Sequence, residues 1–187
     1  GYTVHYKEKV FQLHLPFGDP ASVENCFHCV ATMLHLGFSA DEIQSGIDML
    51  RAVPMRMELK EGINQSQIID DSYNNDLAGL QISLDFLSNQ QQRQRRVLVL
   101  SDILQSGVAT ELWTKQVATL MARNQIDLFI GIGTELRSHK DVFPTSSLFF
   151  DSTNSFLQHL TEEWFSNSIV LVKGARMFAF ERIAQRL

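Results

Sequence analysis

The segment Asp70-Asp71-Ser72-Tyr73-Asn74 concentrates groups that can bind a ligand: two adjacent carboxylates, a hydroxyl, a phenol and an amide. Neighbouring carboxylates repel each other, and burying a charge without a partner is costly. A hydrophobic core therefore gains no stability from such a pair. A cation, a ribose or an ammonium group, in contrast, can bind to such a pair. The segment is therefore the first candidate for a binding site.

A strand, a polar turn and a helix are predicted to position this segment. The run Gln67–Ile69 leads into it, and leucines at helical spacing follow it at positions 77, 80, 84 and 87. Open α/β sheets hold ligand-binding groups in such turns, at the carboxyl ends of their strands. We therefore expect Asp71 to lie at a strand tip.

Four more short apolar runs end in the same way, and each is rich in β-branched or aromatic residues, as is typical of strands buried on both faces. They cover residues 96–100, 127–130, 147–150 and 169–172. Helical patterns cover residues 110–121, 153–164 and 175–187. The alternation predicts an α/β fold with a mainly parallel sheet and flanking helices. The strand tips would carry Asp71, Asp102, Gly133, Asp151 and Lys173 on one edge.

Composition narrows the class of protein. The chain has 187 residues, of which 44% are hydrophobic, as is ordinary for a globular core. A net charge of −5 argues against a nucleic-acid-binding surface. No segment is long enough to span a membrane, no signal peptide opens the chain, and two cysteines fit a reducing cytoplasm. Because the first residue is Gly1, we expect a fragment of a longer protein.

The pattern differs in the first 53 residues. A strand pair is predicted within residues 3–15, a helix from an N-cap at Ser22 to about His35, and a second helix over residues 40–51 with Ser39 as its N-cap. Few strands and no obvious closed core are expected there. We interpret residues 1–53 as the end of a preceding domain, joined through residues 52–54 to an α/β domain that covers residues 54–187.

Four motifs in this chain resemble those of the Mur ligases. They are Pro54–Glu58, Ile69–Asn74, Leu100–Leu104 followed by Gly107, and Val170–Arg176. The Asp-Ser-Tyr-Asn box and the Val-Lys-Gly-x-Arg box, in this order, are quite specific. Within the family, the similarity is greatest to the ligases that add D-Ala-D-Ala to UDP-MurNAc-tripeptide.

The resemblance implies that residues 1–53 are the end of the central ATP-binding domain. Residues 54–187 would be the carboxyl-terminal Rossmann-like domain. The partners it implies are the amino-terminal and central domains of the ligase polypeptide, and a fused alanine racemase is one further expectation.

The implied reaction is ATP-driven amide formation in the synthesis of peptidoglycan precursors in the cytoplasm. ATP phosphorylates the carboxylate of UDP-MurNAc-tripeptide, and the amine of D-Ala-D-Ala attacks the acyl phosphate. The phosphate loop and most Mg²⁺ ligands of the family lie ahead of Gly1, and the chain contains no G-x-x-G-K-[ST] motif. No metal ligand is assigned within the chain, and the chain alone is expected to be inactive.

The resemblance also assigns nucleotide-binding residues. Asn25 matches an asparagine that contacts adenine, although Ala21 and Ser22 replace the family's preceding His and Asn. Arg56 matches an arginine at the interdomain hinge that reaches the ATP phosphates, which implies both a binding and a catalytic role. Asp71 matches the aspartate that approaches the ATP ribose.

A second group of residues is implied on the substrate side. Tyr73 and Asn74 would face the cleft for nucleotide and substrate. The family's usual Ala-Asn-Pro is replaced by Asn75–Leu77, whose central aspartate is expected to cap the next helix. Lys173 and Arg176 match a Lys-Gly-x-Arg box near the substrate.

Several of these residues have simpler interpretations. Asn25 is equally well explained as an exposed helix residue. Arg56 could pair with Glu58 on a surface strand, and Asp102 more often caps a turn than binds a ligand. Asp70 could cap the turn while Asp71 binds, or the reverse. The Cys26–Cys29 motif lies inside a predicted helix without a second ligand pair, so buried helix packing is favoured over a redox or zinc site.

Two other functions remain as alternatives. A phosphoacceptor receiver domain would also have an acidic pair after its first strand and Lys173 after its fifth. It requires an aspartate after the third strand and a Ser or Thr after the fourth, where this chain has Gly131–Gly133 and Asp151. A stand-alone nucleotide-binding module is the other alternative.

Overall fold

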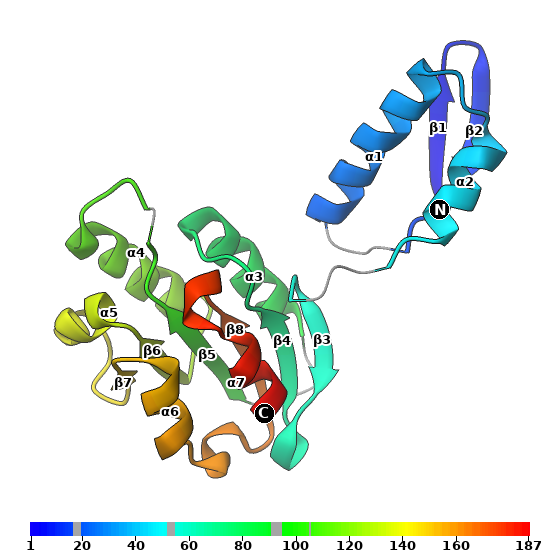
Figure 1. The fold of residues 1–187 in the computed structure, drawn as a ribbon. Helices are drawn as coiled ribbons and strands as arrows, with labels where there is room; N and C mark the ends of the chain where they lie inside the picture. Colours follow the sequence, from blue (N-terminus) through cyan, green and yellow to red (C-terminus); the bar gives the residue numbers. More distant parts are fainter. Residues whose placement is uncertain (17–19, 52–54, 91–94, 105) are drawn as a thin grey trace. The chain divides into compact units, whose positions relative to one another are not determined.

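The computed structural model describes residues 1–16, 20–51, 55–90, 95–104 and 106–187. The chain divides into two compact units, Gly1–Val53 and Pro54–Leu187, which are described separately (Figure 1). The expected linker, residues 52–54, lies outside the described residues.

The first unit consists of a hairpin and two helices. Its elements are β1 (Tyr2–Tyr6), β2 (Lys9–Leu13), α1 (Pro20–His35) and α2 (Ala40–Asp48), and the two strands pair antiparallel as predicted. The unit does have a small core, contrary to expectation, because apolar side chains of β2, α1 and α2 pack together. Its buried members are Leu13, Cys26, Val30, Ile43 and Ile47.

Of the two N-caps predicted in this unit, one is wrong and one is confirmed. α1 begins at Pro20, so Ser22 lies inside the helix and the predicted N-cap there is wrong. Proline favours the first helical position because its missing N–H would have no partner there. Ser39 caps α2 as predicted: its Oγ accepts from the backbone N–H of Glu42, whose carboxylate accepts from the N–H of Ser39.

The second unit is built on one six-stranded sheet. Its strands are β3 (Glu58–Glu61), β4 (Gln67–Asp71), β5 (Arg95–Ser101), β6 (Leu128–Ile132), β7 (Leu148–Phe150) and β8 (Ser168–Lys173). They lie in the order β3-β4-β8-β5-β6-β7. The five predicted strands are all present and parallel to one another, while β3, which was not predicted, pairs antiparallel with β4 at the edge.

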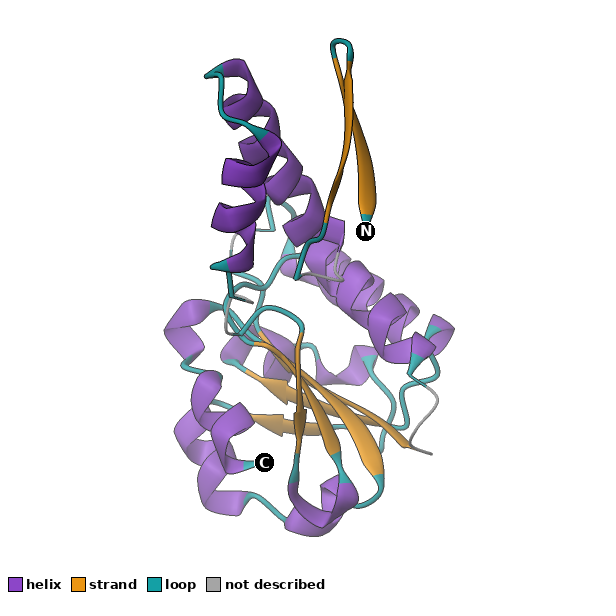
Figure 2. Cartoon of the chain, turned by 90° about the vertical axis from the view of Figure 1, so that its right-hand side faces the viewer, coloured by secondary structure: helices purple, strands orange, loops and turns teal. Residues whose placement is uncertain are grey.

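Helices cover both faces of this sheet (Figure 2). One face packs against α3 (Leu77–Asn89) and α4 (Thr110–Arg123), with Leu84 and Trp113 among the buried side chains. The other face packs against α6 (Thr153–His159) and α7 (Glu181–Arg186), which bury Phe156 and Ile183. The inner parallel strands β4, β8, β5 and β6 are therefore buried on both faces, which explains why their sequences are continuous apolar runs.

Two predicted helices are interrupted in the structure. The pattern over residues 153–164 forms α6 and then a separate 3₁₀ helix, Glu162–Phe165. The pattern over residues 175–187 forms a 3₁₀ turn, Arg176–Phe178, before α7 begins. Ala179, between these two, has a φ of 50°, and this left-handed conformation ends the first turn.

Candidate functional site

The neighbouring parallel strands β4 and β8 end at a point where the chain diverges. After β4 the chain enters α3 on one face of the sheet, and after β8 it enters α7 on the opposite face (Figure 1). In open α/β sheets, ligands bind in the crevice outside the carboxyl ends of strands at such a switch point. Asp71 and Lys173 face each other there in register, on the edge predicted from the sequence.

Asp71 and Lys173 form a buried ion pair. Nζ of Lys173 lies 2.5 Å from Oδ2 of Asp71, and the two side chains are only 4% and 12% exposed. Ser83 of α3 donates its hydroxyl to the same Oδ2 at 2.6 Å. Lys173 Nζ also donates to the backbone carbonyl of Asn74 at 3.2 Å. The lysine assigned to the substrate side is thus enclosed by β4, the following loop and α3.

Asp70 does not share a site with Asp71. Consecutive strand residues point to opposite faces, and Asp70 accepts from Lys60 of β3 at 2.7 Å and from the Ser72 hydroxyl at 2.5 Å. Burial acts to lower the pKa of Lys60, but its hydrogen bonds to Asp70 and Glu58 outweigh this and raise the pKa. The two carboxylates therefore do not act as one pair: each binds the ammonium group of its own lysine.

Arg56 and Tyr73 form the exposed part of this edge. The guanidinium carbon of Arg56 lies 4.9 Å from the centre of the Tyr73 ring, within the range of a cation–π contact. As a whole residue, Tyr73 is 46% exposed. Glu58 pairs with Lys60 at 3.1 Å, so the simpler interpretation that Arg56 pairs with Glu58 is wrong. A cation and an aromatic face are presented together to solvent.

Arg176 follows β8 and is also exposed. Its Nη1 lies 3.4 Å from Glu181 at the start of α7 and 3.8 Å from the sulfur of Met55. Met55 in turn accepts a hydrogen bond on its carbonyl from the N–H of Tyr73. The structure therefore brings the two predicted arginines, Arg56 and Arg176, to the same end of the sheet.

The loop between β4 and α3 is held by asparagines and an aspartate. Asp76 caps α3 as predicted, accepting from the N–H of Gly79 at 2.7 Å, and Asn74 donates to the Asp76 carboxylate at 3.1 Å. Asn75 was not singled out as a functional residue. It is 5% exposed and donates its amide to the carbonyl of Ser101 at 2.8 Å, and within the described residues its Oδ1 has no partner. The sequence signal that could have identified Asn75 is the replacement of the family's Ala-Asn-Pro by Asn75–Leu77.

Asp102 has the simpler of its two roles. Its carboxylate accepts from the N–H groups of Glu135 and Leu136 at 3.0 and 2.9 Å, and so caps α5 (Thr134–Ser138). Burial raises its pKa even though these bonds act to lower it. Gly133 has a φ of 139°, and a Cβ there would collide with the Asp102 carboxyl group, which explains the glycine. Asp151 pairs with Arg137 on the exposed surface.

The remaining predicted residue, Asn25, belongs to the first unit, where it is exposed on α1. In the neighbouring motif, Cys26 is buried in the small core and Cys29 is exposed, so packing explains the first cysteine only. Among the described residues, no group of three or more potential metal ligands is found. No helix in the described part of the chain is long and apolar enough to cross a membrane.

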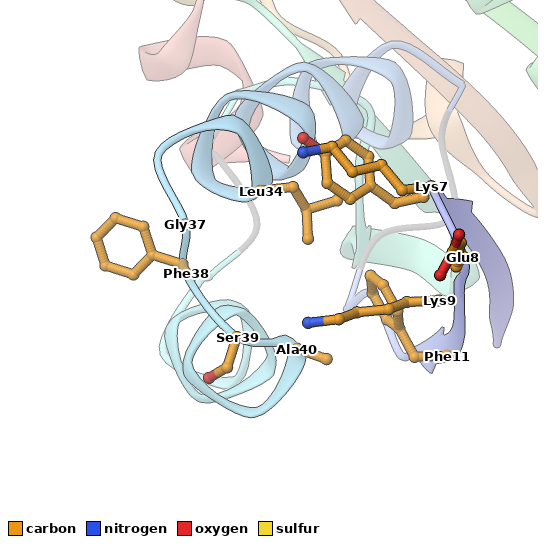
Figure 3. Close-up of a pocket in the computed structure, with 10 residues that line it drawn as sticks. Lys7, Glu8, Lys9, Phe11, Leu34, Gly37, Phe38, Ser39 and Ala40 are labelled. Atoms are coloured by element: carbon orange, nitrogen blue, oxygen red, sulfur yellow. The ribbon is translucent and has the colours of Figure 1, made fainter.

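Among the described residues, two of the hollows have a volume of about 520 Å³ each, and no predicted site residue lines either of them. The first lies between the hairpin end and the turn from α1 to α2, with Lys7, Lys9, Phe11 and Phe38 on its walls (Figure 3). The second is a groove between α3 and α4.

Comparison with known proteins finds relatives in sequence but no family model. No family model matches the chain. The chain is 26% identical over 175 residues to the UDP-N-acetylmuramoyl-tripeptide–D-alanyl-D-alanine ligase of Escherichia coli (strain K12), which covers 92% of this chain and 38% of the relative. It is 22% identical over 195 residues to the ligase of the same name from Bacillus subtilis (strain 168), covering 100% of this chain and 41% of the relative.

Solved structures show the same fold. A crystal structure of MurF from Acinetobacter baumannii has a TM-score of 0.77 at 22% identity, and covers 98% of this chain and 41% of that protein. MurF ligase from Thermotoga maritima in complex with ADP has a TM-score of 0.65 at 16% identity, and covers 100% of this chain and 44% of that protein. The chain spans about two fifths of the length of the curated relatives it matches. In sequence, the chain is therefore similar to part of two ligases of this name, and in fold it is similar to part of the MurF ligases.

Proposed function

We propose that this chain is the carboxyl-terminal region of an ATP-dependent ligase that adds D-Ala-D-Ala to UDP-MurNAc-tripeptide during the synthesis of peptidoglycan precursors. The observation that carries this proposal is the similarity of 92% of the chain to a ligase of that name. The natural polypeptide would then be longer and would contain the phosphate loop. The enzyme would act in the cytoplasm.

The edge formed by β4, β8 and the following loops is proposed to face the nucleotide. Asp71 can accept a ribose hydroxyl on Oδ1, because Lys173 and Ser83 occupy Oδ2. Arg56 and Tyr73 offer a guanidinium and an aromatic face, which suit an anionic nucleotide. Mg²⁺ is proposed to be held mainly by residues outside this chain.

In the proposed reaction, the substrate carboxylate attacks the terminal phosphoryl group of ATP and releases ADP. The amine of D-Ala-D-Ala then attacks the acyl carbonyl, and phosphate leaves as the amide forms. Arg56 would stabilise negative charge on the transferring phosphoryl group, a role that suits a residue that stays protonated. Tyr73, Asn74 and Arg176 would orient the substrates around it.

The alternatives are less well supported. A receiver domain has its parallel strands in the order 2-1-3-4-5, whereas the parallel strands here lie in the order 1-5-2-3-4 when numbered along the chain. This topology argues against a receiver. No observation specifically supports the alternative of a stand-alone nucleotide-binding module. The comparisons give no support to a fused alanine racemase.

The test is a ligation assay with the natural polypeptide that contains this chain. The assay contains ATP, Mg²⁺, UDP-MurNAc-tripeptide and D-Ala-D-Ala. We expect mass spectrometry to show a product in which one D-Ala-D-Ala is joined to the UDP-MurNAc-tripeptide, and one ADP should be released for each product formed. The 187-residue chain alone should form none. A folded natural polypeptide that makes no product, or an isolated chain that does, would overturn the proposal.

A further inference from the structure

The loop Ser72–Asp76 combines exposed side chains with buried ones. Tyr73 and Asn74 point their side chains to solvent, and Tyr73 carries the contact with Arg56. Ser72 and Asn75 are buried on either side of them, at 0% and 5% exposure. A surface loop that must show an aromatic ring at a fixed place needs such anchors, because loops are otherwise the mobile part of a fold.

Lys173 is the first anchor. Its ammonium group has three donors, and it donates to Asp71 Oδ2 and to the carbonyl of Asn74. A Cβ added to Gly79, in the first turn of α3, would lie 3.4 Å from Nζ, so the ammonium group also approaches the helix. Only 3% of the residue is exposed, so Lys173 is enclosed by these partners rather than open to solvent.

Asn75 is the second anchor, on the other side of the loop. Its amide donates to the carbonyl of Ser101 at the tip of β5. The Ser101 hydroxyl oxygen accepts from the N–H of Ala175, two residues after Lys173. The two anchors therefore fasten one loop to the tips of β8 and β5.

Lys173 and Ser83 also fix the direction of Asp71. Both donate to Oδ2, whereas within the described residues no hydrogen bond reaches Oδ1. One oxygen is therefore committed to the protein, and the other is left for a ligand.

We infer that Lys173 and Asn75 are positioning residues: they hold the loop Ser72–Asp76 and the Asp71 carboxylate in a preformed shape, and Lys173 does not contact the substrate. The identity of the ligand that this shape receives rests on the proposed function. The positioning itself is a property of the chain and can be measured without any ligand.

The first experiment measures loop order by ¹⁵N relaxation on the 187-residue chain. Lys173→Met alone would leave Asp71 buried without its cation, so the main variant is Asp71→Asn/Lys173→Met, which removes both charges. We expect the order parameters of the amides of residues 73–76 to fall from about 0.85 to below about 0.6, with the sheet unchanged. Asn75→Ala should loosen the same amides. The resonances of Arg56 should lose their ring-current shift from Tyr73.

The matched control is Asp70→Asn/Lys60→Met, which removes both charges of the neighbouring pair on the opposite face of β4 and keeps an oxygen at position 70 that can accept from Ser72. It should leave the amides of residues 73–76 at their wild-type order. If the double variant and Asn75→Ala both keep the loop rigid, the inference is wrong.

The second experiment separates positioning from substrate contact in the natural polypeptide. If Lys173 acts through Asp71 and the loop, the two residues form one unit. Adding Lys173→Met to Asp71→Asn should then change the KM for UDP-MurNAc-tripeptide and the KM for D-Ala-D-Ala by less than about threefold. A further tenfold rise in the KM for UDP-MurNAc-tripeptide would mean direct contact and would overturn the inference. Absence of any ligation by the wild type would overturn the proposed function and leave the relaxation result standing.

Discussion

The guanidinium of Arg56 lies over the ring of Tyr73, with its central carbon 4.9 Å from the ring centre. The contact joins the residues that precede β3 to the loop that follows β4. It presents a permanent cation and an aromatic face at the switch point of the sheet. This pairing leads to the first prediction.

Arg56→Ala should lower the turnover of the natural ligase far more than its stability. Loss of one group that stabilises charge in the transition state costs about 3 kcal/mol, or about a hundredfold in kcat. The side chain is exposed, so the melting temperature should change little. Steady-state kinetics and thermal melts of the same samples check this. Normal kcat with an early melt would make Arg56 structural.

Asp71→Ala should affect both nucleotide binding and folding. Removing a hydroxyl acceptor should raise the KM for ATP. Removing the partner of buried Lys173 should also lower the free energy of unfolding by about 3 to 5 kcal/mol. The control is Asp151→Ala, because Asp151 pairs with Arg137 on the surface and its loss should cost at most about 1 kcal/mol. Equal stability losses in the two variants would contradict the buried pair.

The sequence predicts the parallel strands well because each lies between two helical layers and reads as a continuous apolar run. β3 was missed for the opposite reason. The edge strand Glu58–Glu61 is four residues long and holds three charged residues, so it lacks both length and an apolar pattern. Ala179 shows a further limit: an alanine gives no local signal for a left-handed conformation, which tertiary packing imposes.

The candidate site could be predicted only in part. The tips of the strands follow from the apolar runs, so Asp71 and Lys173 were expected on one edge. Their direct contact depends on β8 lying beside β4, and strand order is not encoded in any local pattern. The separation of Asp70 from Asp71 follows from strand alternation once residues 67–71 are known to be extended.

Asp102 should give the second unit a characteristic pH dependence. Burial raises its pKa above the ordinary 3.8, so the folded state favours the protonated form. The stabilisation is complete below pH 3.8 and is lost as the pH rises through the raised pKa. The unfolding free energy of the wild type minus that of Asp102→Asn should therefore decrease as the pH rises, because only the wild type loses this stabilisation.

The measurement is urea unfolding followed by tryptophan fluorescence between about pH 3 and pH 7. Both tryptophans, Trp113 and Trp164, lie in the second unit, so the signal reports on that unit alone. A difference that grows with pH would show that the hydrogen bonds at the start of α5 dominate over burial.

Cys29 should react with iodoacetamide in the native chain, and Cys26 should not. Burial, followed by the nearby Cys29, raises the pKa of the Cys26 thiol and lowers its thiolate fraction, whereas Cys29 is exposed. Peptide mapping should show one adduct in the native chain and two in urea. Cys29→Ser is the matched control and should give no native adduct. Rapid labelling of Cys26 would contradict its packing role.

The most direct test of the account is photolabelling of the natural polypeptide with an ATP analogue that carries an azidoanilide group on its terminal phosphate, followed by peptide mapping. The account predicts that, within the second unit, labelled peptides come from the β4 edge, with Tyr73 as the main modified residue, and that excess ATP prevents the labelling. Tyr73→Ala should lose this label, whereas Tyr2→Ala, in the first unit, should keep it. ATP-protected labelling confined to the opposite end of the sheet, or to the groove between α3 and α4, would contradict the account.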